Sequence, residues 1–541
     1  MATRTDPTMA ADKHSPSDQH AVFPLRVACV DMGSNAIRFV AAEFATETDS
    51  VRLASDRSSI RLGHGVYLSG RLGAAAMDAA VGALAGYREQ MDALGVTSYR
   101  AVATSAVRES SNGDAFVDRI RKETGLELDV ISGSEEARLV HLAVSRKIPL
   151  GTRQWLLVDL GGGSVEVSLV DANGTFWSES HTMGSVRLLE ELTEAGEDPG
   201  RFRRLLEEYI SVLHVPPAAQ HRKVAGYIAT GGNIETLAKL GGFPDEDGVT
   251  TLPLDTLRAV IEQLARLSFR QRVDELGLRE DRADVVLPAA LVYERLAELC
   301  GTDEIIVPHV GIKEGVLYDL VGGLAHQRDH EDRQERDVLI GAVTVGRKYL
   351  FDEDHARHVA NLAVSVFDQT RPLHELGSAD RKILTAAALL HDIGQFVSYK
   401  GHHKHSLYLL SNTELPNFTQ REMELVANVA RYHRKGEPAP HHPHYESLSD
   451  TDKQRVLKLS AVLRLADSLD REHVQRVRHV DVRIGESEIT LWLEGAGDLL
   501  LEGWSLKKKS QLFTKVFGRK VRLRFVDGGA SEGDVTAVGG S

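Results

Sequence analysis

The chain of 541 residues has only two cysteines, Cys29 and Cys300, and each stands inside an apolar stretch. This scarcity excludes a disulfide framework, and we expect two reduced thiols in a cytoplasmic protein. No apolar run approaches the ~18 to 20 residues that a membrane-spanning helix needs, so no membrane partner is expected. Residues 1–20 lack the apolar segment of a signal peptide and predict a flexible tail over residues 1–24.

Positive charge is also scarce, because 64 Lys and Arg face 78 Asp and Glu and give a formal net charge of −14. This balance argues against a basic nucleic-acid-binding protein, and we expect no specific nucleic-acid partner. A polyanionic ligand is still compatible with it, since a local basic groove can lie on an acidic body. Hydrophobic residues at 42% and charged residues at 26% are typical of a globular protein.

An acidic pattern occurs twice in the chain. An apolar run ends in Asp31-x-Gly33, and a second ends in Asp159-x-Gly161, which is 159 − 31 = 128 residues later. A β-rich segment follows each turn directly, so each pattern predicts a hairpin in which glycine permits a tight turn and close approach of a ligand. Repetition at this distance predicts two related α/β domains that face one another across a cleft.

The periodicity of the remaining chain divides it into further segments. Beyond the second α/β domain the pattern becomes mainly helical, and near the C-terminus it becomes β-rich. The charged residues 326–336 predict an exposed linker or helix surface. The predicted divisions are 25–150 for the first α/β domain, 151–325 for the second, 326–475 for a helical domain, 476–527 for a β-rich domain and 528–541 for a second flexible tail.

Two facing Asp-x-Gly turns suit the binding of a metal-bound phosphate chain. The carboxylates of Asp31 and Asp159 are hard oxygen ligands for Mg²⁺, with Mn²⁺ as the alternative, and Glu166 on the following strand can point back into the cleft. Glycine turns expose N–H groups that wrap a phosphate, although the same arrangement would serve an ATP-dependent kinase. The candidate phosphate-binding residues are Gly33, Ser34, Asn35, Gly161, Gly162 and Ser164, together with the later turn Gly231 and Gly232.

Six motifs occur in the order found in exopolyphosphatases and guanosine pentaphosphate phosphatases. They are Val30-Asp-Met-Gly-Ser-Asn35, Thr104-Ser-Ala-Val-Arg108, Ile131-Ser-Gly-Ser-Glu-Glu-Ala-Arg138, Val158-Asp-Leu-Gly-Gly-Gly-Ser164, Met183-Gly-Ser-Val-Arg187 and Ala229-Thr-Gly-Gly232. From about Leu25 onward the sequence therefore resembles the Ppx/GppA family, in its long form with a C-terminal HD-like domain. The resemblance implies that both leading domains are actin-like, which is a ribonuclease-H-like α/β fold.

The same resemblance implies an activity and roles for two further residues. The activity is hydrolysis of a terminal phosphoanhydride with release of orthophosphate. Glu136 corresponds to the general base that deprotonates the attacking water, and Arg108 would neutralise a neighbouring phosphate.

Each assignment has a structural alternative. Glu136 could complement the dipole of its helix, Asp31 and Asp159 could form turns, Arg108 could lie on a helix surface, and Arg138 could pair with an acid on its own helix. The resemblance favours the functional interpretation for all of these except Arg138.

The sequence departs from the family pattern at four polar positions. Ala36 and Val165 stand where hydroxyl residues are usual, Asn233 replaces a Thr and Lys313 replaces an Arg. Since every carboxylate remains, we expect these changes to affect ligand selectivity more than the reaction.

The helical segment carries a second candidate site. His355, His391, Asp392 and Asp467 follow the order of the HD phosphohydrolase superfamily, whose imidazoles and carboxylates can bind a divalent metal. The site is either a second phosphohydrolase or a retired site whose cationic residues extend a polyphosphate channel, and we favour the latter because fold-level resemblance does not establish chemistry. The candidate channel residues are His402, His403, Lys404, His405, Arg431, His433, Arg434 and Lys435.

A basic cluster lies in the β-rich segment. It could bind a long polyanion, contact a partner subunit in a homodimer, or form a solvated β face. Its members are Lys507, Lys508, Lys509, Lys515, Arg519, Lys520, Arg522 and Arg524.

The function favoured by these patterns is metal-dependent exopolyphosphatase activity on inorganic polyphosphate. The alternatives are a guanosine pentaphosphate 5'-phosphatase, a non-catalytic regulator that binds polyphosphate or an alarmone, and a kinase of the actin-like superfamily.

Overall fold

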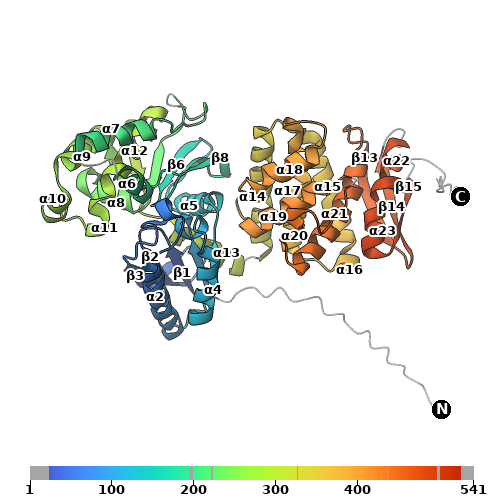
Figure 1. Ribbon diagram of the computed structural model, residues 1–541, viewed down its shortest axis with the longest axis horizontal. Helices are drawn as coiled ribbons and strands as arrows, with labels where there is room; N and C mark the ends of the chain where they lie inside the picture. Colours follow the sequence, from blue (N-terminus) through green and yellow to red (C-terminus); the bar gives the residue numbers. More distant parts are fainter. Residues whose placement is uncertain are drawn as a thin grey trace, which may run out of the picture.

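The computed structural model describes residues 23–193, 199–220, 223–325, 327–434, 436–495 and 500–525. Apart from residues 23 and 24, the two predicted tails lie outside these residues. Cys29 and Cys300 are both buried free thiols. Among the described residues, none of the helices has the length and apolar character needed to cross a bilayer. Figure 1 shows the α/β part of the chain at one end, the helical domain beside it and a small sheet at the other end.

The first α/β domain contains a five-stranded sheet of order β3-β2-β1-β4-β5. Strands β1 and β2 form the first predicted hairpin, and β4 and β5 extend the sheet in parallel with β1. Its elements are β1 (Leu25–Met32), β2 (Ile37–Phe44), β3 (Ser50–Ser58), α1 (Val66–Ser69), α2 (Ala74–Ala93), β4 (Ser98–Ala103), α3 (Ser105–Arg108), α4 (Gly113–Thr124), β5 (Leu128–Val130) and α5 (Gly133–Lys147).

The second α/β domain contains a seven-stranded sheet of order β10-β11-β12-β9-β6-β7-β8, and β6 and β7 form the second predicted hairpin. Its elements are β6 (Trp155–Leu160), β7 (Val165–Asp171), β8 (Gly174–His181), α6 (Ser185–Thr193), α7 (Pro199–Ile210), β9 (Tyr227–Thr230), α8 (Gly232–Gly241), β10 (Phe243–Pro244), β11 (Thr250–Pro253), α9 (Leu254–Arg266), α10 (Phe269–Asp274), α11 (Glu280–Ala283), α12 (Val286–Cys300), β12 (Glu304–Val307) and α13 (Ile312–Ala325).

Helices α5 and α13 are exchanged between the two α/β domains. Val140 and Val144 of α5 share a core cluster with Leu157 of the second sheet, although α5 follows the first sheet in the chain. Val316 of α13 shares a cluster with Val27 of the first sheet, although α13 follows the second. The packing therefore does not divide at residues 150 and 325, and the two crossing helices join the domains.

The helical domain and the C-terminal sheet share one hydrophobic core, which contains both Leu389 of α17 and Leu491 of β14. Residues 327–336 begin helix α14 and do not form a linker. The elements are α14 (Gln327–Lys348), α15 (Glu353–Gln369), α16 (Arg371–His374), α17 (Ser378–Leu390), the 3₁₀ turn Ile393–Phe396, α18 (His402–Ser411), α19 (Gln420–Arg431), α20 (Pro443–Glu446), α21 (Asp450–Ser468), β13 (Val477–Ile484), β14 (Glu488–Gly495), α22 (Leu500–Lys509), α23 (Gln511–Phe517) and β15 (Lys520–Phe525).

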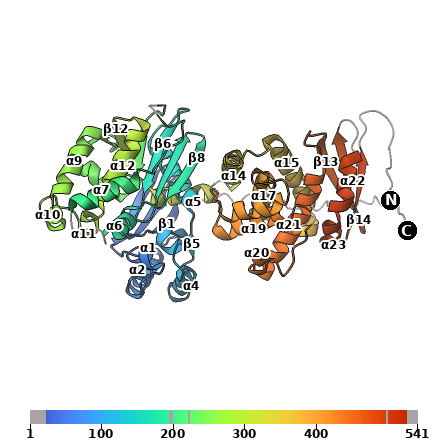
Figure 2. The ribbon, with the colours of Figure 1, turned by 45° about the horizontal axis from the view of Figure 1, so that its top comes forward.

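The helical domain contacts the second α/β domain through α14, which lies beside the edge strand β8 in both ribbon views (Figure 1, Figure 2). The hydroxyl of Thr344 on α14 bonds the carbonyl oxygen of Phe176 on β8 at 3.4 Å. A second contact, between the loop that follows α18 and the start of α5, bears on the candidate site.

Substitution of Gly315 tests the helix exchange. A Cβ atom at Gly315 of α13 would overlap the carbonyl oxygen of Leu139 on α5. Because an extra methyl group in a packed core costs about 1–3 kcal/mol, we expect Gly315→Ala to lower the melting temperature by several degrees. The matched control is Gly82→Ala on α2, where a Cβ atom meets nothing within 4 Å and the melting temperature should hold or rise. Equal melting temperatures for the Gly315→Ala variant and the parent would contradict the tight crossing.

Candidate active site

The two acidic hairpins have the same local geometry. Asp31 stands opposite Arg38 in the first hairpin, and Asp159 stands opposite Glu166 in the second. The N–H of Gly33 donates to the carbonyl oxygen of Ala36 at 3.1 Å, and the N–H of Gly161 donates to that of Ser164 at 3.0 Å. The repeat in the sequence is therefore a structural repeat, in which one turn is built twice.

A single cleft brings together most of the predicted site residues. Arg108 and Glu166 are not in its wall but lie behind it, where each interacts with other site residues. The predicted residues that line the cleft are Asp31, Gly33, Ser34, Asn35, Glu136, Asp159, Gly161, Gly162, Ser164, Gly231 and Gly232.

The turn at Gly231 and Gly232 requires glycine. Gly231 has a φ of +102°, in the region that favours glycine, and it approaches the carbonyl oxygen of Leu160. A Cβ atom on Gly232 would overlap the guanidinium of Arg282. This turn therefore packs closely on the second acidic hairpin and leaves its backbone exposed to the cleft.

Glu136 is placed at the cleft by the start of α5. The side chain of Ser132 caps this helix by accepting a bond from the N–H of Glu135 at 3.2 Å. Glu136 is only 4% exposed, and Arg108 donates to its Oε1 at 2.7 Å. Burial raises the pKa of Glu136 to about 7 despite Arg108, and the charges of Asp159 and Asp31 act in the same direction as burial. A carboxyl group with this pKa can accept a proton near neutral pH.

Two other buried carboxylates lie close to Glu136. The hydroxyl of Ser180 donates to Oε1 of Glu166 at 3.0 Å, while Oε2 of Glu166 is buried and has no hydrogen-bond partner among the described residues. Burial, with the charge of Glu136, raises the pKa of Glu166 well above its ordinary value. Burial also raises the pKa of Asp159, whose Oδ1 accepts from Thr230 at 2.7 Å. This concentration of negative charge fits a bound cation.

The carboxylates of the cleft do not converge on one point. Among the described residues, the groups of three metal-binding side chains whose ligand atoms all lie within 4.8 Å lie elsewhere, in the helical domain. In addition, Oδ2 of Asp31 accepts from Arg38 at 2.8 Å. Asp31, Asp159 and Glu166 therefore suit an ion that keeps several of its water ligands, as Mg²⁺ does.

Two arginines of the site were not predicted. Arg38 occupies the position in the first hairpin that Glu166 occupies in the second, so alignment of the two repeats would have found it. Arg282 lines the cleft and donates to Oδ1 of Asn233 at 3.0 Å. Burial lowers the pKa of Arg282 to about 10, and Arg38 contributes to the shift. No local motif marks Arg282, because it lies about 50 residues beyond the turn that it contacts.

The motif around Arg187 supports the second turn. Its guanidinium donates through Nε to the carbonyl oxygen of Gly163 at 2.8 Å and lies 4.0 Å above the ring of Tyr67. The Tyr67 hydroxyl in turn bonds Ser34 Oγ at 2.7 Å. This network links the turns of the two hairpins.

Lys313 also faces the cleft from the start of α13, where its Nζ lies 3.2 Å from Oε1 of Glu314.

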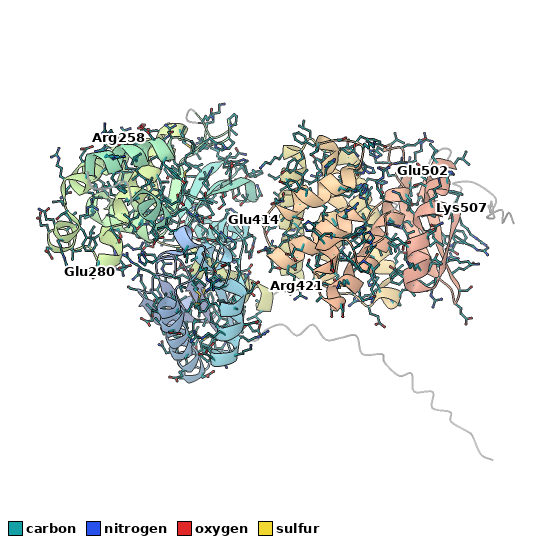
Figure 3. All side chains as sticks on the ribbon, in the orientation of Figure 1. Arg258, Glu280, Glu414, Arg421, Glu502 and Lys507 are labelled. Atoms are coloured by element: carbon teal, nitrogen blue, oxygen red, sulfur yellow. The ribbon has the colours of Figure 1, made fainter. Side chains whose placement is uncertain are left out.

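Arg138 has the structural role predicted for it, since its Nε donates to Oε2 of Glu135 at 2.8 Å. Glu135 does more than complement the helix dipole, because it also accepts from Arg100 at 3.2 Å and from the N–H of Asn417 at 2.9 Å. The adjacent Ser134 N–H donates to Glu414 at 3.2 Å, and Figure 3 shows Glu414 where the helical domain meets the α/β domains. The helical domain thus contacts the first turn of the helix that carries Glu136.

The second candidate site also gathers its predicted residues. Ligand atoms of His355, His391 and Asp467 lie within 4.8 Å of one another, and those of His391, Asp392 and His433 do so as well. Of the other predicted channel residues, Lys435 lies outside the described residues. Burial lowers the pKa of His403 to about 3, so its ring adds no positive charge to the lining at neutral pH.

The basic cluster near the C-terminus lies only partly on a β face, because Lys520, Arg522 and Arg524 are on β15 and the lysines before them are on helices. Lys507–Lys509 lie on α22, and Lys515 lies on α23. Lys515 pairs with Glu437 at 2.7 Å, and Arg522 pairs with Glu488 at 2.7 Å. The apolar residues between β14 and β15 recur at helical spacing, which places Lys507–Lys509 and Lys515 on helices. The acidic neighbours Glu437 and Glu488 offset part of the positive charge of the cluster.

Three features define an actin-like α/β enzyme of phosphate chemistry: the facing acidic repeats, the glycine turns that line one cleft, and a buried glutamate with a pKa of about 7. Residues 44–323 match the profile of the Ppx/GppA phosphatase family, and residues 341–509 match that of Ppx/GppA phosphatase, domain III. The chain therefore belongs to the Ppx/GppA phosphatase family and is a phosphatase.

Proteins named as guanosine-5'-triphosphate,3'-diphosphate pyrophosphatases and as exopolyphosphatases are both similar in sequence to this chain. A guanosine-5'-triphosphate,3'-diphosphate pyrophosphatase of Aeromonas hydrophila is 27% identical over 480 residues, which cover 86% of this chain and 92% of the relative. The protein of that name from Pseudoalteromonas translucida is 28% identical, over 75% of this chain and 80% of its own length. An exopolyphosphatase from Cytophaga hutchinsonii, whose crystal structure is known, is 30% identical in sequence to this chain. The two structures superpose with a TM-score of 0.51, and the match covers 55% of this chain and 98% of that chain.

The raised pKa of Glu136 predicts a pH dependence for phosphatase activity. A general base must be unprotonated, so activity should rise with pH and level off above the pKa of about 7. Well below that pKa the rate should fall roughly tenfold per pH unit. Initial rates of phosphate release at constant ionic strength measure this profile. A rate that stays constant from pH 5 to 8 would contradict the role of Glu136.

Proposed function

We propose that the protein is a metal-dependent exopolyphosphatase that hydrolyses the terminal phosphoanhydride of inorganic polyphosphate and releases orthophosphate. The observation that carries this proposal is the position of Glu136, a buried carboxylate with a pKa of about 7 at the edge of a cleft lined by two glycine turns. N–H groups of the glycine turns other than those of Gly33 and Gly161, which bond within the turns, would bind phosphate oxygens. The cleft is also lined by the cationic side chains of Arg38, Arg282 and Lys313.

Each of these residues has a separate role in the proposed reaction. The turns that begin at Gly33 and Gly161 hold the terminal phosphate, and Arg108 places Glu136 against the attacking water. Glu136 takes a proton from that water as its oxygen attacks the terminal phosphorus in line with the anhydride oxygen. The bond from that phosphorus to the bridging oxygen breaks, and the shortened chain leaves with the oxygen. Mg²⁺, or Mn²⁺, bound through Asp31, Asp159 and Glu166 would offset the charge of the phosphates.

Guanosine pentaphosphate is the alternative substrate, because it presents a terminal phosphate to the same cleft and because the curated relatives carry that activity in their names. A non-catalytic regulator is the third candidate, and the buried Glu136–Arg108 pair argues against it. We further propose that the enzyme acts in the cytoplasm as a homodimer and that its helical domain is HD-like.

A direct comparison of substrates tests the proposed function. Orthophosphate release is measured on long-chain polyphosphate and on guanosine pentaphosphate, side by side, with Mg²⁺ titrated from zero. We expect a higher kcat/KM for polyphosphate and a requirement for the divalent cation, because successive phosphates can follow the cleft. A higher kcat/KM for the nucleotide would assign the alternative function. Binding of both ligands without release of phosphate would support a regulator.

Two neighbouring glutamates provide a matched pair of variants. Glu136→Gln removes the base and should lower kcat by about 10²–10⁴-fold, the usual contribution of general base catalysis. Polyphosphate affinity should be largely kept, because both glycine turns survive. Glu135→Gln should instead keep most of kcat and lower the melting temperature, since it breaks the pairs with Arg138 and Arg100. An equal loss of kcat in both variants, or a loss of binding in Glu136→Gln that matches its loss of rate, would contradict these roles.

A further inference from the structure

Four buried imidazoles of the helical domain have the same orientation. Each ring directs Nδ1 to an oxygen and thereby points Nε2 toward the carboxylate of Asp467 or of Asp392. The bonds join His355 to Asp470 Oδ2 (2.8 Å), His391 to the carbonyl oxygen of Ala388 (2.7 Å), His402 to that of Tyr399 (3.1 Å) and His433 to that of Ala430 (2.7 Å). Since these oxygens only accept, the hydrogen of each neutral ring is on Nδ1, and Nε2 presents a lone pair.

The Nε2 lone pairs of His402 and His433 face the carboxylate of Asp392, and no hydrogen atom lies between these three acceptors. Nε2 of His402 lies 3.2 Å from Nε2 of His433. These atoms lie 3.0 and 3.3 Å from Oδ1 of Asp392. A hydrogen bond between the rings would need one of them to carry a second proton, and so a charge, in a buried position. Three acceptors in this arrangement repel one another unless a cation lies among them.

A second set of acceptors adjoins the first. Nε2 of His355 and Nε2 of His391 lie 4.0 and 3.8 Å from Oδ1 of Asp467. Nε2 of His391 is also 3.8 Å from Oδ2 of Asp392. Both Nε2 atoms are buried and have no hydrogen-bond partner among the described residues. Atoms separated in this way leave room for an ion with metal–ligand bonds of ~2.0–2.2 Å.

We propose that these six side chains form a centre for two divalent transition-metal ions, with Asp392 as the bridge. One ion is bound by His355, His391 and Asp467, and the other by His402 and His433. Mixed imidazole and carboxylate ligands suit zinc, manganese, iron or cobalt. The inclusion of His402 and His433 as ligands assigns them a role other than the lining of a polyanion channel.

The surroundings of the centre have the features that metal sites need. Asp470 orients His355 from behind, as carboxylates commonly do for ligating histidines. The ammonium group of Lys509 contacts Oδ2 of Asp467, which leaves Oδ1 directed at the histidines. A cavity of about 500 Å³ reaches His355 and Asp392 from the surface and provides a path of entry.

The number of metal ions that each protein chain retains tests this proposal independently of enzymatic activity. The full-length protein is stripped with a chelator, dialysed against Zn²⁺ in the presence of excess Mg²⁺, which fills the proposed phosphatase site, then desalted and analysed for zinc by inductively coupled plasma mass spectrometry. We expect the parent protein to retain two ions per chain. His433→Gln and His391→Ala each remove a ligand of one ion and should retain one, and Asp392→Ala, which removes the bridge, should retain none. The matched control is His479→Ala, an exposed histidine on β13, which should retain both.

Circular dichroism and phosphate release confirm that each variant is folded. The proposal is overturned if the parent retains no more metal than Asp392→Ala, and the two-ion arrangement is overturned if His433→Gln retains as much as the parent. Asp159→Asn separates this centre from the proposed active site, because it should lower phosphate release and leave the retained metal unchanged.

Discussion

The crossing of α5 and α13 is the contact on which the geometry of the cleft depends. Each helix leaves the sheet of one α/β domain and packs on the sheet of the other, and they meet where Gly315 lies against the backbone of Leu139. The first turn of α5 carries Glu136, and the first turn of α13 carries Lys313. The crossing therefore brings both residues to the boundary between the two acidic hairpins, which would otherwise belong to separate domains.

Burial and like charge act together in this cleft. Glu136, Asp159 and Glu166 are all buried, and burial raises the pKa of each. Burial of the Glu136 side chain is the largest cause of its raised pKa, and the charges of Asp159 and Asp31 add to it. The two repeats divide the charge unevenly, because the position that holds Glu166 in one hairpin holds Arg38 in the other. The second hairpin therefore carries more negative charge than the first.

The local features of the site were predictable from the sequence, and the long-range ones were not. Asp31 and Asp159 could be placed because a hairpin is encoded by adjacent residues and the pattern occurs twice. Arg282 could not be placed, since only tertiary packing brings it to Asn233. For the same reason the sequence did not reveal the exchanged helices or the core shared by the helical domain and the C-terminal sheet. The helices that carry Lys509 and Lys515 were missed because strong β signals on both sides obscured a short helical spacing.

The central claim is that the acidic hairpins and Glu136 act on one phosphate chain in one cleft. Crystals of the Glu136→Gln variant grown with polyphosphate and Mn²⁺ test it most directly, through the anomalous signal of the metal and the density of the chain. The account predicts a manganese peak between Asp31 and Asp159, with the terminal phosphorus facing residue 136. Polyphosphate bound on another surface, with the metal and residue 136 both remote from its end, would contradict it.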